Sequence, residues 1–486
     1  MQKNTNQRPS SKFSSWQLLI VICLVTSCYS TELSDFHKTV LSPPPVTPKH
    51  IILFIGDGMQ LEHEVAASRY LYGVDFGLTW HGFPYRSYAS TWDVDVYNAY
   101  ASDDGKPDYS ENNFDPILGY DPSQGGIAPY PIVKTGSVSY LLRAATDSAG
   151  AATALATGVK TDSGNISWRS GDPPNGAIVT IAQQMKKHKG AAIGVVTTVP
   201  FNDATPAAFV SHNTNRGDLI GIADEIIHVT APDVVIGAGH PDWGATITAE
   251  QLDYLRNSGD YVLVERVAGE NGGARLIAAA ENLPPSGKLF GLFGGSGGLF
   301  EPPVPQDNPG NPNFVVEDEN PSLAEATEAA LTVLSRNKHG FFIMAEGGAI
   351  DKANHANNYS MMIGCMWDFE KAVRAAVDFV NRPGDDIDWT NTLLIVTADH
   401  ANSLMRLTDN PELGAGDLPT QVGGSYPDGE VTYGTSGHTN ELVTVYAMGA
   451  DSYLFYSFEG SWYPGDEIID DTQIFMTMAK AGGVLY

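Results

Sequence analysis

The sequence predicts an α/β fold with a mostly parallel central β-sheet that is flanked by helices on both faces. Short apolar runs rich in β-branched residues are typical of buried strands. Helical patterns lie between several of these runs, for example at 322–336. Continuous apolar strands that alternate with helices indicate a parallel sheet, because both of its faces must be covered. The predicted strands lie at 50–56, 191–198, 233–238, 340–345, 392–398 and 442–449.

Residues 1–27 are predicted to be a secretion signal rather than part of the fold. Lys3, Arg8 and Lys12 occur in a segment without acidic residues, and the apolar run 18–25 follows them. A basic segment before a short apolar run is the pattern of a signal peptide, and this run is too short to span a bilayer. We therefore expect an exported protein, periplasmic or at the cell surface.

Cys28 is the expected point of lipid attachment. Residues 25–28, VTSC, resemble the lipobox of bacterial lipoproteins, whose cysteine is lipidated after cleavage. The lipobox prefers leucine three residues before the cysteine, where this chain has Val25. Ordinary cleavage without a lipid is the alternative. Cys23 leaves with the signal, and Cys365 lies in a helical pattern and is expected to be a buried apolar side chain.

The rest of the chain divides into a tether and one domain. Residues 28–47 end in LSPPPVTP, a proline-rich run that favours an extended tether. Residues 48–486 contain the alternating strand and helix patterns and are expected to form a single domain. Two segments rich in glycine, proline and asparagine, at 101–135 and 294–321, are expected to be surface insertions.

The charge of the chain excludes some partners. Its 57 acidic and 28 basic residues give a formal net charge of -29. This balance argues against nucleic acid or an anionic membrane surface as a partner, because a phosphate backbone requires basic patches. The acidity itself is typical of adaptation for solubility or high salt. An anionic substrate would need local positive charge, from metal ions or arginine.

Acidic residues follow the predicted strands at the positions where ligands bind in open parallel sheets. A single acid after a strand is most often a helix cap or turn former. Several carboxylates brought together at one edge would repel one another, and bound cations would relieve that repulsion. The residues concerned are Asp57, Asp203, Thr205, Glu346, Asp399 and His400.

Two further segments fit a cluster of metal ligands. Asp351 and His355 are spaced i and i+4, which places them on one face if the segment is helical. His438 lies in a glycine-flanked loop before the last predicted strand. A lone histidine is more often structural than a ligand. Here, however, three histidines, His355, His400 and His438, each lie close to an acidic residue or to a strand end, and this favours a metal site. Mixed oxygen and imidazole ligands suit Zn²⁺, whereas the oxygen-only set of Asp57, Thr205 and Glu346 suits Mg²⁺.

The stretch TDSAGAATALATG, residues 146–158, predicts a short helix of small residues that ends at a glycine. Ser148 in its first turn has two interpretations. It is either part of an N-cap or a nucleophile placed where the helix N-terminus attracts an anion.

Six sequence blocks together resemble the bacterial alkaline phosphatases, in family order over most of residues 50–440. They are ILFIGDGM, TDSAGAATALATGVKTDSG, DATPAAFVSHNTNR, FFIMAEGGAIDKANHA, LLIVTADH and GHTNE. The resemblance implies a three-layer sandwich with 48–486 as the catalytic domain, a phosphate monoester substrate and a homodimer. It also implies that Ser148 is the phosphorylated nucleophile, that Arg216 clamps two phosphate oxygens and that Lys352 reaches the phosphate through water.

The same resemblance assigns the ions. One zinc would be held by Asp351, His355 and His438, and a second by Asp57, Asp399 and His400. One magnesium would share Asp57 and be held by Thr205 and Glu346, with Asp203 in its outer shell.

One departure and four alternatives accompany the resemblance. Gln60 stands where the family has glycine after GDGM, beside Asp57. A phosphodiesterase of the same superfamily is the main alternative, although Arg216 argues against it. A sulfatase would need a CxPSR-like motif, which is absent, and the signal argues against a cytosolic phosphoglycerate mutase. An inactive surface-binding lipoprotein on this scaffold is expected to have lost ligands, and none is lost. No nucleic acid binding is expected, except that the end of a nucleic acid chain could be a substrate.

Overall fold

The computed structural model describes residues 49–127, 137–408 and 413–484. The predicted signal, the tether and Cys28 lie outside these residues. Within the described residues, no helix is both long and apolar enough to cross a membrane.

The core is a ten-stranded sheet in the order β16-β2-β15-β10-β1-β9-β3-β4-β6-β5. Within this sheet only β15 runs antiparallel to its neighbours β10 and β2, and the other strand pairs are parallel. The predicted mostly parallel α/β sheet is therefore confirmed. Its strands are β1 (His50–Ile55), β2 (Tyr85–Ser90), β3 (Ala192–Pro200), β4 (Val234–Ala238), β5 (Tyr261–Glu265), β6 (Lys288–Leu292), β9 (Phe341–Glu346), β10 (Thr392–Thr397), β15 (Val443–Gly449) and β16 (Ile468–Asp470).

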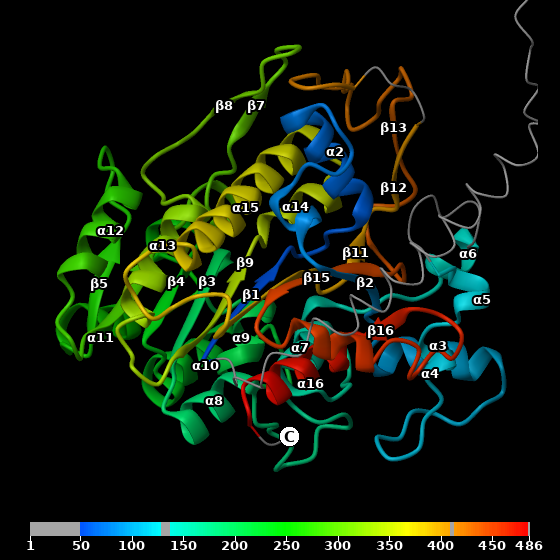
Figure 1. Cartoon of the computed structure of the whole chain (residues 1–486), viewed down its shortest axis with the longest axis horizontal. Coiled ribbons are helices and arrows are strands. Elements are labelled where there is room, and N and C mark those ends of the chain that lie inside the picture. Colours follow the sequence, from blue (N-terminus) through cyan, green and yellow to red (C-terminus); the bar gives the residue numbers. More distant parts are fainter. Residues whose placement is uncertain (1–48, 128–136, 409–412, 485–486) are drawn as a thin grey trace, which may run out of the picture. The chain divides into compact units, whose positions relative to one another are not determined.

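Helices cover both faces of this sheet (Figure 1). On one face α13 packs on β3 and β9, and α12 and α15 pack on α13. On the other face α8 and α9 pack on β3 and β9, and α7 packs on α9 and α16. The helices are α2 (Leu61–Tyr72), α3 (Val94–Asp103), α4 (Pro116–Gly119), α5 (Pro122–Gly125), α6 (Val138–Leu141), α7 (Ser148–Thr157), α8 (Ile181–Lys189), α9 (Ala204–Val210), α10 (Leu219–Glu225), α11 (Ala249–Asn257), α12 (Gly272–Asn282), α13 (Leu323–Leu334), α14 (Ala349–His355), α15 (Tyr359–Val380) and α16 (Asp471–Ala481).

All six strands predicted from the sequence are strands of this sheet. β1, β9 and β10 are buried along their whole length, which explains their uninterrupted apolar sequences. Two of the sheet strands that we did not predict, β2 and β5, are partly exposed, and β2 is also interrupted by polar residues. Cys365 is buried in α15, as expected.

The two predicted insertions contain regular structure. The first holds α4 and α5, and it continues from the end of α3, where a separate aromatic core includes Trp92, Tyr97 and Tyr120. The second forms a short ribbon of β7 (Val304–Gln306) and β8 (Asn313–Val315), and Phe314 of this ribbon stacks on Trp367 of α15 with ring centroids 4.2 Å apart.

Candidate active site and metal centres

Four neighbouring strands end in the polar residues that the sequence analysis selected. β10, β1, β9 and β3 are adjacent in that order. Ile55 of β1 is level with Thr397 of β10 and with Glu346 of β9, which in turn is level with Thr197 of β3. Because these strands are parallel and in register, their carboxyl ends meet at one edge of the sheet. The residues at these ends are Asp57, Asp203, Thr205, Glu346, Asp399 and His400.

His400 lies at the centre of one group of ligand atoms. Its Nε2 atom is 3.1 Å from Ser148 Oγ and 3.4 Å from both Asp57 Oδ1 and Asp399 Oδ2. All four side chains are buried, and in the described part of the chain the two carboxylate oxygens have no hydrogen-bond partner. Buried oxygens without a partner are strongly unfavourable unless a cation compensates them. Two carboxylates, an imidazole and a hydroxyl form a donor set that fits Zn²⁺.

Asp351, His355 and His438 form a second group. On α14, His355 Nε2 is 3.4 Å from Asp351 Oδ2, as the i and i+4 spacing predicted. His438 Nε2 is 3.5 Å from Asp351 Oδ1 and 3.1 Å from His355 Nε2. Each imidazole Nδ1 lies within hydrogen-bond distance of a backbone carbonyl, that of Ser436 for His355 and that of Thr146 for His438. Donation from Nδ1 fixes the tautomer in which Nε2 is free to bind a metal.

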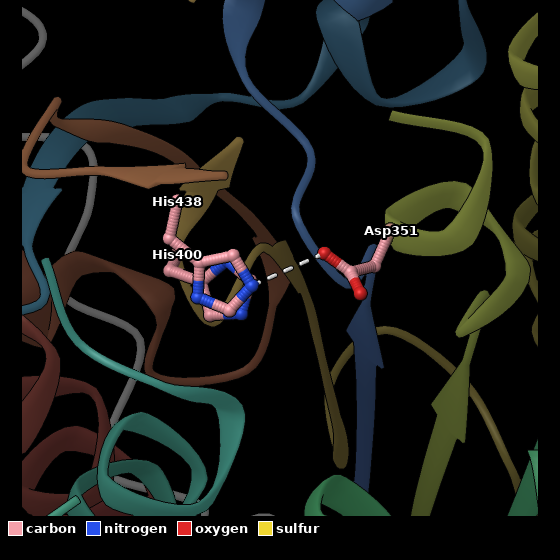
Figure 2. A group of neighbouring side chains, drawn as sticks. All are labelled: Asp351, His400 and His438. Atoms are coloured by element: carbon pink, nitrogen blue, oxygen red, sulfur yellow. Dashed lines mark ion pairs between the residues drawn. The ribbon is translucent and has the colours of Figure 1, made fainter. Parts of the chain in front are cut away.

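The two groups are adjacent. The rings of His400 and His438 stack with their centroids 3.6 Å apart, and Figure 2 shows the carboxylate of Asp351 pointing toward this pair. A short antiparallel ladder between β11 (Ala401–Asn402) and β14 (His438–Thr439) brings the two histidines together. The ligand atoms of Asp351, His400 and His438 lie within 4.8 Å of one another, as do those of Asp57, Asp399 and His400.

The oxygen ligands expected for magnesium are supported by fewer contacts than the two groups above. Glu346 Oε1 and Thr205 Oγ1 are buried and have no hydrogen-bond partner among the residues described. The other oxygen of Glu346 accepts a hydrogen bond from Thr197 Oγ1. Asp203 is the N-cap residue of α9, and its Oδ1 accepts a hydrogen bond from Arg216. Unpartnered carboxylate and hydroxyl oxygens fit Mg²⁺ in chemical type.

Electrostatics at this edge favour cation binding. Burial, reinforced by neighbouring carboxylates, raises the pKa of Asp57 well above its ordinary value, that of Glu346 to about 8 and that of Asp399 to about 6. Burial lowers the pKa of His400, and the charge of His438 adds to the effect. Burial also acts to raise the pKa of Asp351, but the hydrogen bond from His438 and nearby positive charge hold it well below its ordinary value. Without a cation, Glu346 therefore retains its proton near neutral pH.

Ser148 is the first residue of α7, and Asp147 is its N-cap. Asp147 Oδ1 accepts a hydrogen bond from the backbone N–H of Gly150 at 2.9 Å. All ten residues of α7 are buried, and its last turn ends at Gly158, where a Cβ atom would lie 2.4 Å from the ring of Phe475. The small residues of this helix thus allow close packing. The cap is supplied by Asp147, so the hydroxyl of Ser148 is left to face His400.

Two cations face the site. Arg216 donates from Nη1 to Asp147 Oδ2 at 3.0 Å and from Nη2 to Asp203 Oδ1 at 3.2 Å. Lys352 Nζ lies 3.3 Å from Asp351 Oδ2. Burial lowers the pKa of Arg216 and of Lys352, but the surrounding carboxylates outweigh it, so both pKa values are raised and both groups stay charged.

Gln60 is accommodated rather than disruptive. It is the buried N-cap residue of α2, and its side-chain amide donates to Met405 O at 3.0 Å. The glycine that the tight turn requires is Gly58, which has a φ of 67° and lies where a Cβ would be 2.8 Å from Asp351 Oδ1.

The sequence analysis did not identify Asn402 as a residue of the site. Its Nδ2 donates to Asp351 Oδ1 at 2.6 Å, and its position in the sequence, two residues after His400, was the available signal.

Comparison with known proteins places the chain in a family. A family model described as alkaline phosphatase matches residues 128–416. The alkaline phosphatase of Escherichia coli strain K12 is 30% identical over 397 residues, which cover 72% of this chain and 76% of that protein. The Escherichia fergusonii alkaline phosphatase is 29% identical over 484 residues, covering 90% and 86%. The crystal structure of Thermus thermophilus alkaline phosphatase has the same fold, with a TM-score of 0.60, 18% identity and coverage of 90% and 92%.

The fold is a mostly parallel α/β sheet, and the edge at the ends of its strands carries two groups of residues that could hold metal ions. The chain belongs to the alkaline phosphatase family, so the resemblance, the fold and the enzyme class inferred from the sequence are confirmed. Phosphate monoesters are substrates consistent with this family, and the matches do not favour the phosphodiesterase alternative.

Proposed function

We propose that this enzyme hydrolyses phosphate monoesters through a phosphoserine intermediate on Ser148. The observation that carries the proposal is the place of Ser148 Oγ, beside His400 Nε2 and the unpartnered oxygens of Asp57 and Asp399. A serine-histidine-aspartate triad would need a carboxylate at His400 Nδ1. Among the described residues that atom has no hydrogen-bond partner, and both aspartates lie near Nε2. His400 is therefore better suited to be a metal ligand than a general base.

We propose two Zn²⁺ ions and one Mg²⁺ ion as cofactors. When bound, such ions lower the pKa of a serine hydroxyl and stabilise charge on the entering and leaving oxygens of phosphoryl transfer. One zinc would be held by Asp57, Asp399 and His400, the other by Asp351, His355 and His438, and the magnesium by Asp57, Thr205 and Glu346 with Asp203 outside them.

The remaining groups bind and orient the phosphate. Arg216 donates two of its five N–H groups to Asp147 and Asp203, which leaves three for non-bridging phosphate oxygens. The N-terminus of α7 adds its dipole. Ser148 Oγ gives its proton to water and attacks phosphorus, the bond to the leaving oxygen breaks, and that oxygen takes up a proton from water to leave as the alcohol. Water then displaces the serine oxygen and releases inorganic phosphate.

We also propose export and a lipid anchor at Cys28, because residues 1–28 carry the signal and lipobox pattern. A periplasmic or cell-surface location would follow, and a homodimer is proposed by analogy with the family.

The stereochemistry of hydrolysis tests the intermediate. Two successive in-line displacements retain configuration at a chiral phosphorus, whereas a single displacement inverts it. We expect retention by the wild type, and inversion by any residual activity of Ser148→Ala, because water would then attack the ester directly. Inversion by the wild type would exclude a phosphoserine. Rates on p-nitrophenyl phosphate and on a diester, with and without chelator, would separate monoesterase from diesterase activity.

A further inference from the structure

Asp93 is a buried carboxylate that lies between α3 and the residues around the nucleophile. It is the N-cap of α3, where its Oδ1 accepts from Val96 N at 2.8 Å. Its Oδ2 accepts from two hydroxyls, Thr146 Oγ1 at 3.0 Å and Ser163 Oγ at 2.7 Å. Only 1% of the residue is exposed. A helix cap requires only the first of these hydrogen bonds, so the other two need a separate explanation.

The first hydroxyl leads to a candidate zinc ligand. Thr146 lies two residues before Ser148, and its backbone carbonyl accepts from His438 Nδ1 at 2.8 Å. This hydrogen bond fixes the His438 ring with Nε2 toward Asp351. Because Asp93 holds the Thr146 side chain, it also limits where the Thr146 carbonyl can lie. Groups that orient a metal ligand in this way contribute to metal affinity.

The second hydroxyl, that of Ser163, is linked through hydrogen bonds to Arg216, the proposed phosphate-binding residue. Ser163 precedes Gly164, whose N–H donates to Asp147 Oδ2 at 3.1 Å and whose carbonyl accepts from the backbone N–H of Arg216 at 2.8 Å. Arg216 Nη1 also donates to that Asp147 oxygen. Asp93 therefore supports, through Ser163, the loop against which Arg216 is placed.

Helix α7 also contacts Asp93 closely. A Cβ atom at Gly150, two residues after Ser148, would lie 3.0 Å from Asp93 Cβ and 3.2 Å from Asp93 Oδ2. The first turn of α7 thus contacts the side chain of Asp93 directly. Burial raises the pKa of Asp93 to about 6, so the group is ionised at alkaline pH and accepts all three hydrogen bonds.

We propose that Asp93 is a positioning residue of the active site, acting on His438 through Thr146 and on Arg216 through Ser163. This inference rests on the proposed function, because it assigns Asp93 a role in placing a zinc ligand and a phosphate-binding group. It predicts that the two hydroxyls affect different properties. Loss of the Thr146 hydroxyl should weaken zinc binding, and loss of the Ser163 hydroxyl should weaken phosphate binding.

The test is a comparison of Thr146→Val with Thr146→Ser. Valine is nearly isosteric with threonine but lacks the hydroxyl, and serine keeps it. Competition with a chromophoric chelator should show zinc affinity reduced about 10- to 100-fold in the valine variant and little changed in the serine variant. Ser163→Ala should raise the inhibition constant of inorganic phosphate and KM about fivefold, with zinc affinity unchanged.

The outcomes are separable. Equal zinc affinity in the two Thr146 variants would overturn the role of Thr146, and an unchanged phosphate constant in Ser163→Ala would overturn that of Ser163. Lower thermal stability of all variants, without either change, would reduce Asp93 to a structural residue. If Thr146→Val fails to fold, Ser163→Ala still decides its half of the proposal, and zinc binding by Thr146→Ala against Thr146→Ser decides the other. A wild type that binds zinc but does not hydrolyse p-nitrophenyl phosphate would refute the proposed function instead.

Discussion

Replacement of Arg216 by alanine is the sharpest test of how the site recognises phosphate. Its guanidinium lies between Asp147 and Asp203, at 3.0 and 3.2 Å, and its side chain is 30% exposed. This geometry holds the planar fork in place while the remaining N–H groups stay available. Removing it takes away the donors to phosphate and leaves two carboxylates facing an incoming anion without compensation.

The expected loss follows from these contacts. A charge-assisted pair of hydrogen bonds is worth about 1.5–3 kcal/mol, which corresponds to about a 10- to 150-fold fall in kcat/KM for p-nitrophenyl phosphate. Inhibition by inorganic phosphate should weaken in parallel. A diester carries one charged oxygen fewer and should lose less. Arg216→Lys, which keeps the charge but not the fork, should lie between alanine and the wild type.

Steady-state kinetics of the three proteins on a monoester and a diester provide the measurement. Zinc content is the control, because Arg216 is not a proposed ligand and should leave it unchanged. Equal losses on the two substrates would refute the clamp. So would a lysine variant as active as the wild type, because a point charge would then suffice.

Three further predictions follow from the ligands and the N-terminus. His438→Ala should contain about one zinc fewer than the wild type by metal analysis, and unchanged zinc content would contradict its assignment. The metal-free protein should lose stability in urea as pH rises from about 4.5 to about 8, because burial raises the pKa of Glu346 and the folded state holds its proton more tightly than the unfolded state. Added Mg²⁺ should flatten this decline, and a stability that rises with pH would contradict it. Fatty-acid labelling of cells should mark the wild type and not Cys28→Ser; equal labelling would refute the lipid anchor.

Much of the site was predictable because its ligands follow buried strands. Asp57, Glu346 and Asp399 come directly after or at the end of apolar runs, and adjacent parallel strands deliver them to one edge. The i and i+4 spacing placed Asp351 and His355 together because residues four apart lie on the same face of a helix. Such features depend only on the period of a strand or helix.

The contacts that complete the site join residues far apart in the chain. His400 meets Ser148 across 252 positions, and His438 meets Thr146 across 292. The stacking of His400 on His438 depends on a two-residue ladder, β11 with β14, which carries no apolar pattern that could reveal it. Asp93 has the ordinary sequence signal of a helix cap, and only the fold shows that its second oxygen faces Thr146 and Ser163.

The features that the sequence revealed most clearly are those that oppose folding. Buried, mutually repelling carboxylates raise one another's pKa and leave oxygens such as those of Asp57 and Asp399 without a partner in the described structure. A chain selected only for stability would replace them with apolar residues. Arg216 and Lys352 compensate this charge only at the rim, through Asp147, Asp203 and Asp351. Among the described residues, the unpartnered oxygens of Asp57 and Asp399 form no ion pair with lysine or arginine, so a bound cation would allow this edge to be both ionised and stable.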